Sequence, residues 1–189
     1  GDLPAAEGAY EKALTNSTKG DGGERLMALG ALAETQMRQG KVDEATKTTD
    51  QMIKAAPDNP MVKQLRGQVA AAGGKLDEAR TLLEEAVAAM PENYQARTLL
   101  GIVNMQQGNL GQAEMHFNAV LANQPDNARV QRLLAELRAQ QQTPEETLAA
   151  LQPTLASGNA DPTMLAMAGR MSLAAGNREQ ALAYFTQAS

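Results

Sequence analysis

The feature that most constrains the fold of this chain is a 34-residue spacing shared by four series of residues. The glycine series is Gly40, Gly74, Gly108 and Gly176, and Gln142 replaces glycine at the one remaining position. The alanine series is Ala45, Ala79, Ala113 and Ala181, and Thr147 replaces alanine at the one remaining position. The proline and asparagine series are Pro57, Pro91 and Pro125, and Asn59, Asn93 and Asn127. One period shared by four series indicates a repeat architecture in which each repeat is a single supersecondary unit.

Each series has a mechanical role in a repeat built from two helices. The glycine is expected to follow the first helix, because glycine readily takes the left-handed conformation that closes a helix C-terminus. The alanine is expected where the second helix crosses the first, since a larger side chain would push the two apart. The proline ends the second helix, and the Asn or Asp after it caps the next first helix. In the repeat without its glycine, Thr143 to Glu146 predict a capping box with Pro144 inside it.

The apolar spacing predicts helices throughout and no strand. The first helices of the repeats (the A helices) are predicted near 24–38, 60–72, 93–106, 127–141 and 162–174. The second helices (the B helices) are predicted near 42–55, 76–89, 110–122, 144–156 and 178–188, with a B helix of a partial repeat over about 3–16. The segment from Thr15 to Gly23 breaks the spacing, and its glycines predict a flexible loop insertion.

The predicted organisation is a single array over residues 1–189. It comprises a half repeat at 1–16, repeats at 26–59, 60–93, 94–127 and 128–161, and a truncated repeat at 162–189. No repeat can bury its apolar face alone, so neighbours must stack, and such arrays need polar repeats at their ends. Because this sequence starts and stops within a repeat, we expect a piece of a longer array, whose two ends favour end-to-end self-association.

Composition excludes several classes of function. The net charge of -5 argues against nucleic acid, which needs a basic face to displace phosphate counterions. The absence of cysteine removes thiol nucleophiles, disulfides and thiolate metal sites. No apolar run approaches the length of a membrane span. The only histidine, His116, has no neighbouring second ligand for zinc and no oriented catalytic partner. The sequence therefore predicts no catalytic residue, no metal and no cofactor.

Two stretches carry a family resemblance. Leu100-Gly101, Gly108-Asn109-Leu110, Ala113, Phe117, Leu121 and Pro125 resemble a tetratricopeptide repeat at nearly every signature position, and the stretch from Gly67 to Pro91 is similar. The tryptophan that the family places near the start of helix A is absent. The resemblance extends over essentially the whole chain. It implies an all-α fold, a right-handed α-α superhelix (solenoid) of antiparallel helix hairpins, in which the A helices line a concave groove that binds a protein or peptide.

The resemblance also implies which residues face the groove. Carried over from the family's groove positions, they are Met27, Glu34, Met37, Arg38, Met61, Gln64, Gln68, Gln95, Ile102, Met105, Arg129, Arg132, Glu136 and Arg170. The methionines would adapt to apolar partners, and the arginines would hold carboxylates. The alternative is that the methionines pack between helices and the arginines are solvated.

One known specificity of the family is not expected here. Members that grip the acidic C-terminus of a chaperone use a Lys/Asn pair in one A helix and Lys/Arg in the next. The matching positions of this chain hold Gly30, Glu34, Gln64, Gln68, Thr98 and Ile102.

The predicted function is therefore a non-catalytic scaffold for protein–protein interaction. The alanine-, glutamine- and leucine-rich composition is similar to that of bacterial periplasmic or outer-membrane repeat lipoproteins of secretion, pilus assembly or exopolysaccharide export. The alternative is an adaptor in the cytoplasm. Two other functions stay open: a targeting module of an enzyme, such as a glycosyltransferase, whose catalytic domain lies outside this sequence, and an architectural spacer without a groove ligand.

Overall fold

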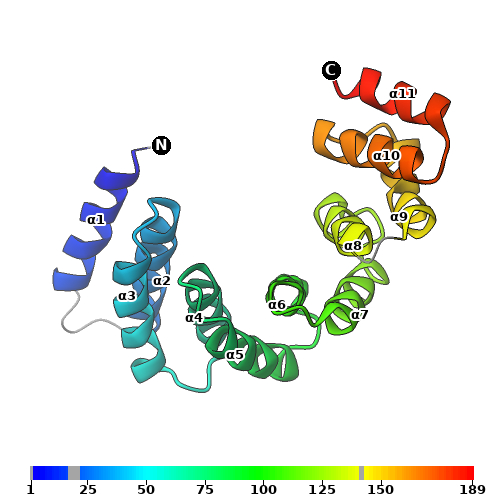
Figure 1. Cartoon of the computed structure of the whole chain (residues 1–189). Coiled ribbons are helices and arrows are strands. Elements are labelled where there is room, and N and C mark those ends of the chain that lie inside the picture. The colour runs from blue at the N-terminus through cyan, green and yellow to red at the C-terminus, as the bar shows by residue number, and fades with distance from the viewer. Residues whose placement is uncertain (1, 17–21, 141–142) are drawn as a thin grey trace. The chain divides into compact units, whose positions relative to one another are not determined.

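The structure is a computed structural model that describes residues 2–16, 22–140 and 143–189. Those residues form eleven helices and no strand, which confirms the all-α prediction (Figure 1). The helices are α1 Leu3–Asn16, α2 Gly22–Arg38, α3 Val42–Ala55, α4 Pro60–Ala72, α5 Leu76–Ala89, α6 Tyr94–Gln106, α7 Leu110–Leu121, α8 Ala128–Gln140, α9 Pro144–Ala156, α10 Pro162–Ala174 and α11 Arg178–Gln187. Each predicted boundary lies within two residues of the observed one.

The chain divides into two compact units, unit 1 from Gly1 to Val103 and unit 2 from Asn104 to Ser189. In unit 1, α1 packs on α2, α2 on α3, α3 on α4 and α4 on α5. In unit 2, the same order runs from α7 through α8, α9 and α10 to α11. Within each unit these helices thus pack against their neighbours in sequence, as successive antiparallel helices of a hairpin do. Consecutive hairpins of this kind are the building blocks of an α-α solenoid.

The glycine series takes the predicted conformation. Gly40, Gly74, Gly108 and Gly176 have φ values of 75°, 75°, 79° and 83°. The amide of the next residue then returns to a carbonyl five residues earlier, as in the bonds from Lys41 to Gln36 (2.9 Å) and from Lys75 to Ala70 (2.9 Å). These bonds close the A helices. Gly158, which is outside the series, also has a positive φ of 73° and turns the chain after α9.

The alanine series lies at the helix crossings, as predicted. Ala45, Ala79 and Ala113 are fully buried, as is Thr147 at the substituted position. Three apolar clusters join the B helices α3, α5 and α9 to the A helices on either side. One cluster contains Leu29, Ala33, Met52, Val62 and Leu65; another contains Ala70, Ala79, Leu83, Ala86, Ala96, Leu100 and Val103; a third, in unit 2, contains Ala135, Leu151, Met164, Met167 and Ala168.

The caps follow the prediction with one exception. The side chains of Asn59, Asn93, Asn127 and Asp161 each accept a hydrogen bond from a backbone amide of the helix that follows. The capping box at Thr143 is wrong, because its side chain makes no cap bond to α9. Its hydroxyl instead donates to the carbonyl of Arg138 (3.1 Å), and its amide reaches the same oxygen at 3.3 Å. The side chain of Thr143 therefore closes the helix before it and does not cap the helix after it.

The segment predicted as a loop insertion overlaps two helices at its ends. Thr15 and Asn16 belong to α1, and α2 begins at Gly22. The rest of that segment, residues 17–21, lies outside the described residues, as does Gln142 of the glycine series.

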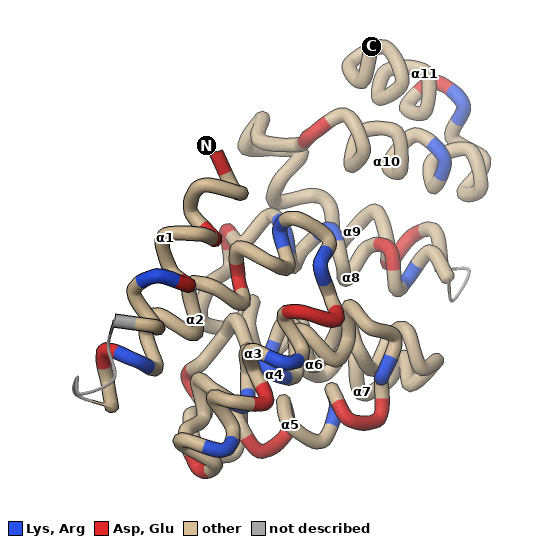
Figure 2. The backbone as a smooth tube through the Cα atoms, turned by 90° about the vertical axis from the view of Figure 1, so that its left-hand side faces the viewer, with Lys and Arg blue, Asp and Glu red and all other residues tan. Residues whose placement is uncertain are grey.

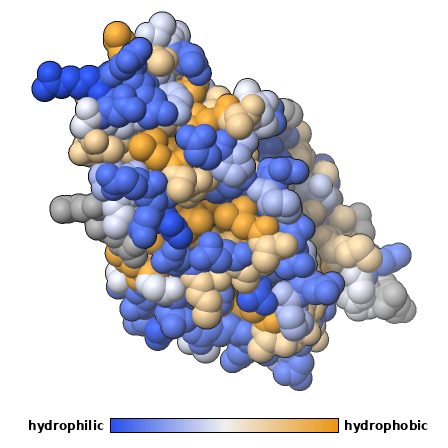
Figure 3. All heavy atoms as spheres, turned by 90° about the vertical axis from the view of Figure 1, so that its right-hand side faces the viewer, coloured by the Kyte–Doolittle hydropathy of each residue, from blue (hydrophilic) through white to orange (hydrophobic). Residues whose placement is uncertain are grey.

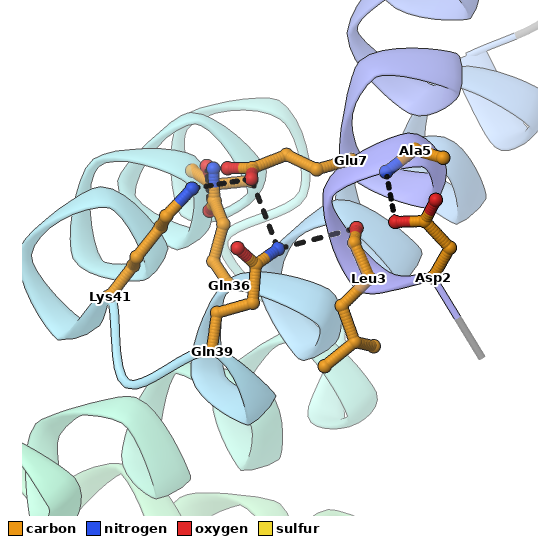
Figure 4. Close-up of polar contacts among 8 residues, drawn as sticks. Asp2, Leu3, Ala5, Glu7, Gln36, Gln39 and Lys41 are labelled. Carbon is orange, nitrogen blue, oxygen red and sulfur yellow. Dashed lines mark hydrogen bonds and ion pairs between the residues drawn. The ribbon is translucent and has the colours of Figure 1, made fainter.

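A buried carboxylate ties α1 to the next hairpin (Figure 4). Glu7 accepts from Lys41 Nζ at 2.6 Å and from Gln39 Nε2 at 3.0 Å, and Gln39 also reaches the carbonyl of Leu3. The hydrogen bond from Lys41 lowers the pKa of Glu7 below its ordinary value of 4.5, and Glu7 raises the pKa of Lys41 above 10.5. The half repeat is thereby fixed to the first full repeat.

The surface mixes charges and apolar side chains. Lys and Arg are interspersed with Asp and Glu along the helices of both units (Figure 2). Apolar patches lie between hydrophilic residues on the face shown in Figure 3. None of the described helices is both long and apolar enough to cross a membrane.

Candidate partner-binding groove

A hollow of about 410 Å³ opens in unit 1 where the A helices α2, α4 and α6 follow one another. Its lining residues are Gly23, Leu26, Met27, Gly30, Ala31, Glu34, Met52, Asn59, Met61, Val62, Gln64, Leu65, Gln68 and Gln95. A second hollow of about 390 Å³ is lined by Glu34, Met37, Arg38, Leu65, Gln68 and Gln95. Four of these residues line both hollows, so the two form one continuous depression, called here the groove.

Methionine dominates the apolar part of the groove. Met27 and Met61 are 73 % and 52 % exposed, which is high for large apolar side chains. Met52, by contrast, is buried and belongs to the cluster beneath the groove with Val62 and Leu65. An unbranched thioether can change rotamer to fit different apolar surfaces at little cost. The groove therefore offers adaptable apolar contact above a packed floor.

The polar side chains of the groove differ in their freedom. Gln64 is buried and accepts a hydrogen bond of 2.6 Å from Asn93 Nδ2, so its amide is fixed within the protein. The same Asn93 nitrogen lies 3.7 Å from the sulfur of Met61. Glu34 and Gln95 are exposed and Gln68 is half-buried. Glu34 and the exposed Arg38 bring opposite charges to one end of the groove.

The structure brings together part of the predicted set. Those that line the groove are Met27, Glu34, Met37, Arg38, Met61, Gln64, Gln68 and Gln95. Ile102 belongs to unit 1 but is outside the groove lining. The others, Met105, Arg129, Arg132, Glu136 and Arg170, lie in unit 2.

In unit 2, the predicted arginines have different surroundings. Arg132 Nη1 pairs with Asp161 Oδ2 at 3.0 Å, and its Nε lies 3.8 Å from Glu136. Asp161 also caps α10 through a bond of 2.8 Å from the Met164 amide. Arg132 and Glu136 are thus part of an internal network that holds α8 to α10. Arg129 and Arg170 are exposed.

Several groove residues were missed by sequence reasoning. Leu26, Ala31 and Val62 line the groove although they are not at the family's groove positions. Asn59 was predicted only as a cap, yet it both caps α4 and lines the groove. Position within the repeat marks only the outward face of each A helix, whereas the side of a groove is formed by the neighbouring residues of that helix.

Among the described residues, no group of three His, Cys, Asp or Glu side chains is arranged to bind a metal ion. His116 is only 9 % exposed, on α7. The side chains that line the groove can bind a partner by apolar contact and hydrogen bonds.

Comparison with solved structures identifies the same fold in other proteins. PilW, described as a widely conserved type IV pilus biogenesis factor, matches with a TM-score of 0.87 at 21 % identity, over 98 % of this chain and 84 % of that chain. BtubC (BKLC) from P. vanneervenii matches with a TM-score of 0.82 at 17 % identity, over 100 % and 90 %. MamA from Desulfovibrio magneticus RS-1 matches with a TM-score of 0.76 at 19 % identity, over 86 % and 92 %. At these identities the likeness shows the fold alone.

Family profiles give the closer assignment, since a search of curated proteins found no match. A profile described as a tetratricopeptide repeat-like domain matches residues 1–102, and one described as a tetratricopeptide repeat matches residues 70–137. The first covers more than half of the 189 residues, and the matched region carries the left-handed glycines and buried alanines of the 34-residue period. The chain therefore belongs to the tetratricopeptide repeat family.

Proposed function

We propose that this chain is a scaffold that holds an amphipathic segment of a protein partner in the groove of unit 1. Proteins of the tetratricopeptide repeat family are generally non-catalytic modules that bind protein partners. The observation that carries the proposal is the exposure of Met27 and Met61 beside a packed apolar floor. Large apolar side chains gathered at a depression are typical of an interaction site.

The lining indicates the kind of segment that would bind. An amphipathic helix lays its apolar face into such a groove, and flexible methionines tolerate variation in that face. Glu34 and Arg38 would contact polar side chains at one end, and Gln68 and Gln95 supply neutral hydrogen-bonding groups. An apolar stripe with mixed polar flanks therefore suits this groove better than a strongly charged peptide.

A biological setting is suggested by the same considerations. We infer a bacterial assembly or secretion-related role, because the composition is similar to that of bacterial envelope repeat proteins and one protein of similar fold is described as a pilus biogenesis factor.

Selection from a phage-displayed peptide library, followed by affinity measurement of the selected peptides, tests the scaffold function without requiring the partner to be identified first.

Matched variants decide whether the groove is the site. Met27→Glu with Met61→Glu places two charges over the apolar floor, and we expect the affinity of the selected peptides to fall by at least about tenfold, or about 1.4 kcal/mol. Met115→Glu is the control, because Met115 is 51 % exposed on α7 and lies outside the groove lining. Unchanged binding by the double variant would contradict the proposal.

A second set of variants tests the predicted basic residues of unit 2. Changing the exposed Arg129 and Arg170 together to Glu should leave peptide affinity unchanged, since the groove lies in unit 1; Arg132 is kept because it pairs with Asp161. Loss of binding in this double variant, with the Met27 and Met61 variant unaffected, would move the site to unit 2.

A further inference from the structure

Gln131 in unit 2 makes the same kind of contact as Arg97, which lies 34 residues earlier. Gln131 Nε2 donates to the carbonyl of Pro125 at 2.6 Å, and Arg97 Nη2 donates to the carbonyl of Pro91 at 2.9 Å. Both pairs join the fourth residue of a repeat to the proline that ends the preceding B helix. In the first and fifth repeats the same position is apolar, with Leu29 and Leu165 buried. The position is thus a buried one in these two repeats, whichever residue type it holds.

Glutamine satisfies this contact and leaves one group unused. Because its Nε2 faces the Pro125 carbonyl, the orientation of the amide is fixed, and Oε1 is left as an acceptor. Gln131 is only 4 % exposed, and Oε1 has no hydrogen-bond partner within the part of the chain that the structure describes. A buried acceptor without a donor is unfavourable, so this atom favours any donor that can reach it.

A cavity of about 180 Å³ lies against this side chain. The residues that line it are Asp126, Ala128, Gln131, Pro153, Thr154, Ser157 and Asn159, from the start of α8 and the end of α9. Ser157 Oγ and the Asn159 amide both donate to the Thr154 carbonyl, which holds this wall of the cavity in place. Among its described lining residues, the charge comes from Asp126, which is acidic and exposed.

We propose that this cavity binds a primary ammonium group carried on an aliphatic stem. The ammonium has three donors, one for the buried Gln131 oxygen, and its charge is attracted by Asp126. Pro153 and Ala128 provide apolar contact for the methylene stem, as protein surfaces do for lysine side chains. The proposal concerns unit 2 and does not depend on the groove of unit 1.

The two natural sources of this group are a lysine side chain of a protein partner and a free alkylamine. Titration of the isotope-labelled chain followed by NMR can separate them, using the Gln131 side-chain amide and the Ser157 backbone amide as reporters. The probes are Nα-acetyl-lysine methylamide, n-butylammonium, and the Nε-acetylated form of the first, which has no charge. We expect saturable shifts with a Kd in the millimolar range for at least one ammonium probe and none for the acetylated probe.

Each combination of results has a meaning. Binding of both ammonium probes, of the lysine derivative alone or of butylammonium alone would support the site and indicate its source. Equal shifts with the neutral probe, or no shift with any probe, would overturn the proposal and leave the cavity as a site for water.

Two variants test the residues, and each is paired with a comparison position in the chain. Gln131→Leu removes the acceptor and introduces the residue that this position holds in the first and fifth repeats, so folding should be retained; we expect binding to weaken at least about tenfold, or about 1.4 kcal/mol. Asp126→Asn, at the surface, should weaken binding several-fold. Asp58→Asn is the matched control, because Asp58 holds the same repeat position in unit 1 and does not line this cavity. Equal binding by native protein and both cavity variants would refute the assignment.

Discussion

The amide of Asn93 joins the start of one helix to the side chain of another. Its Nδ2 donates to Gln64 Oε1 at 2.6 Å, and its Oδ1 accepts from the Ala96 amide at 3.0 Å. A single residue therefore caps α6 and fixes a glutamine of the groove on α4. The asparagine that recurs at the 34-residue spacing as a helix cap thus also holds the Gln64 side chain that lines the groove.

Replacing Asn93 should therefore cost more than removing an ordinary cap. Asn93→Ala removes a cap, worth about 1 kcal/mol, and leaves the buried Gln64 acceptor unpaired, which costs about 1 to 3 kcal/mol. The control is Asn127→Ala, because Asn127 caps α8 at 3.2 Å but its Nδ2 bonds the exposed Gln124. Urea unfolding followed by circular dichroism would compare the two. Equal losses of stability would show that the bond to Gln64 contributes nothing.

The bond between Glu7 and Lys41 predicts a pH dependence. The pKa of Glu7 is lowered in the folded chain, chiefly by the hydrogen bond from Lys41 (2.6 Å), so the folded state holds its proton less tightly than the unfolded state. The stabilisation is therefore fully present above the ordinary value of 4.5 and is lost as pH falls through the lower folded pKa. The pKa of Lys41 is raised above its ordinary value of 10.5 in the folded chain. The stabilisation is therefore fully present below pH 10.5 and is lost as the pH rises through the higher folded pKa.

This dependence can be measured with one variant and one control. The difference in unfolding free energy between native protein and Glu7→Gln should be constant around neutral pH and shrink as the pH falls below 4.5. Glu84→Gln, at an exposed position of α5, should show no comparable change. A native-to-Glu7→Gln difference that stays constant through the acid range would contradict a lowered pKa.

The repeat period was enough to predict the helices, because each boundary is set by a local residue with a backbone role. Gly74 closes α4 by its positive φ, and Asn59 opens it by its side chain. Thr143 shows where this reasoning fails. Its position before Pro144 was interpreted locally, whereas the hydroxyl is taken by the carbonyl of Arg138 from the preceding helix. Two acceptable partners compete there, and sequence spacing does not rank them.

The candidate sites were predicted less completely, for a related reason. Position in the repeat indicates which side of an A helix is outward, and Met27 and Met61, which it selects, both line the groove. It does not indicate which polar side chains are taken up by other parts of the chain, so Gln64 and Arg132 were treated like free groove residues. The Gln131 cavity was missed altogether, because it arises from the length and chemistry of one side chain rather than from any repeated residue.

The outer surface of α11 predicts self-association. Leu182 is 68 % exposed and Leu173, on α10, is 49 % exposed. Exposed apolar side chains of the α10–α11 hairpin can be covered by a second copy, as neighbouring repeats cover one another. We expect the weight-average mass from light scattering to rise with concentration, and Leu182→Glu to suppress the rise. Met90→Glu, 40 % exposed at the end of α5, is the control; a strict monomer at high concentration would contradict the expectation.

Three glycines within helices should respond differently to alanine, because their surroundings differ. At Gly67 a Cβ would lie 2.9 Å from Leu83 Cγ and 3.3 Å from the Ala79 carbonyl, and Leu83 is fully buried, so Gly67→Ala should destabilise the chain by about 1 to 3 kcal/mol. At Gly169 a Cβ would lie 2.6 Å from Phe185 Cε1, but that ring is only half-buried and can turn outward, so we expect a smaller loss. At Gly8 nothing lies within 4 Å, and Gly8→Ala should stabilise α1 by about 0.5 to 1 kcal/mol through helix propensity. Thermal and urea unfolding of the three variants would establish the order, and a Gly67→Ala protein as stable as the native one would show that α4 and α5 do not need their close approach.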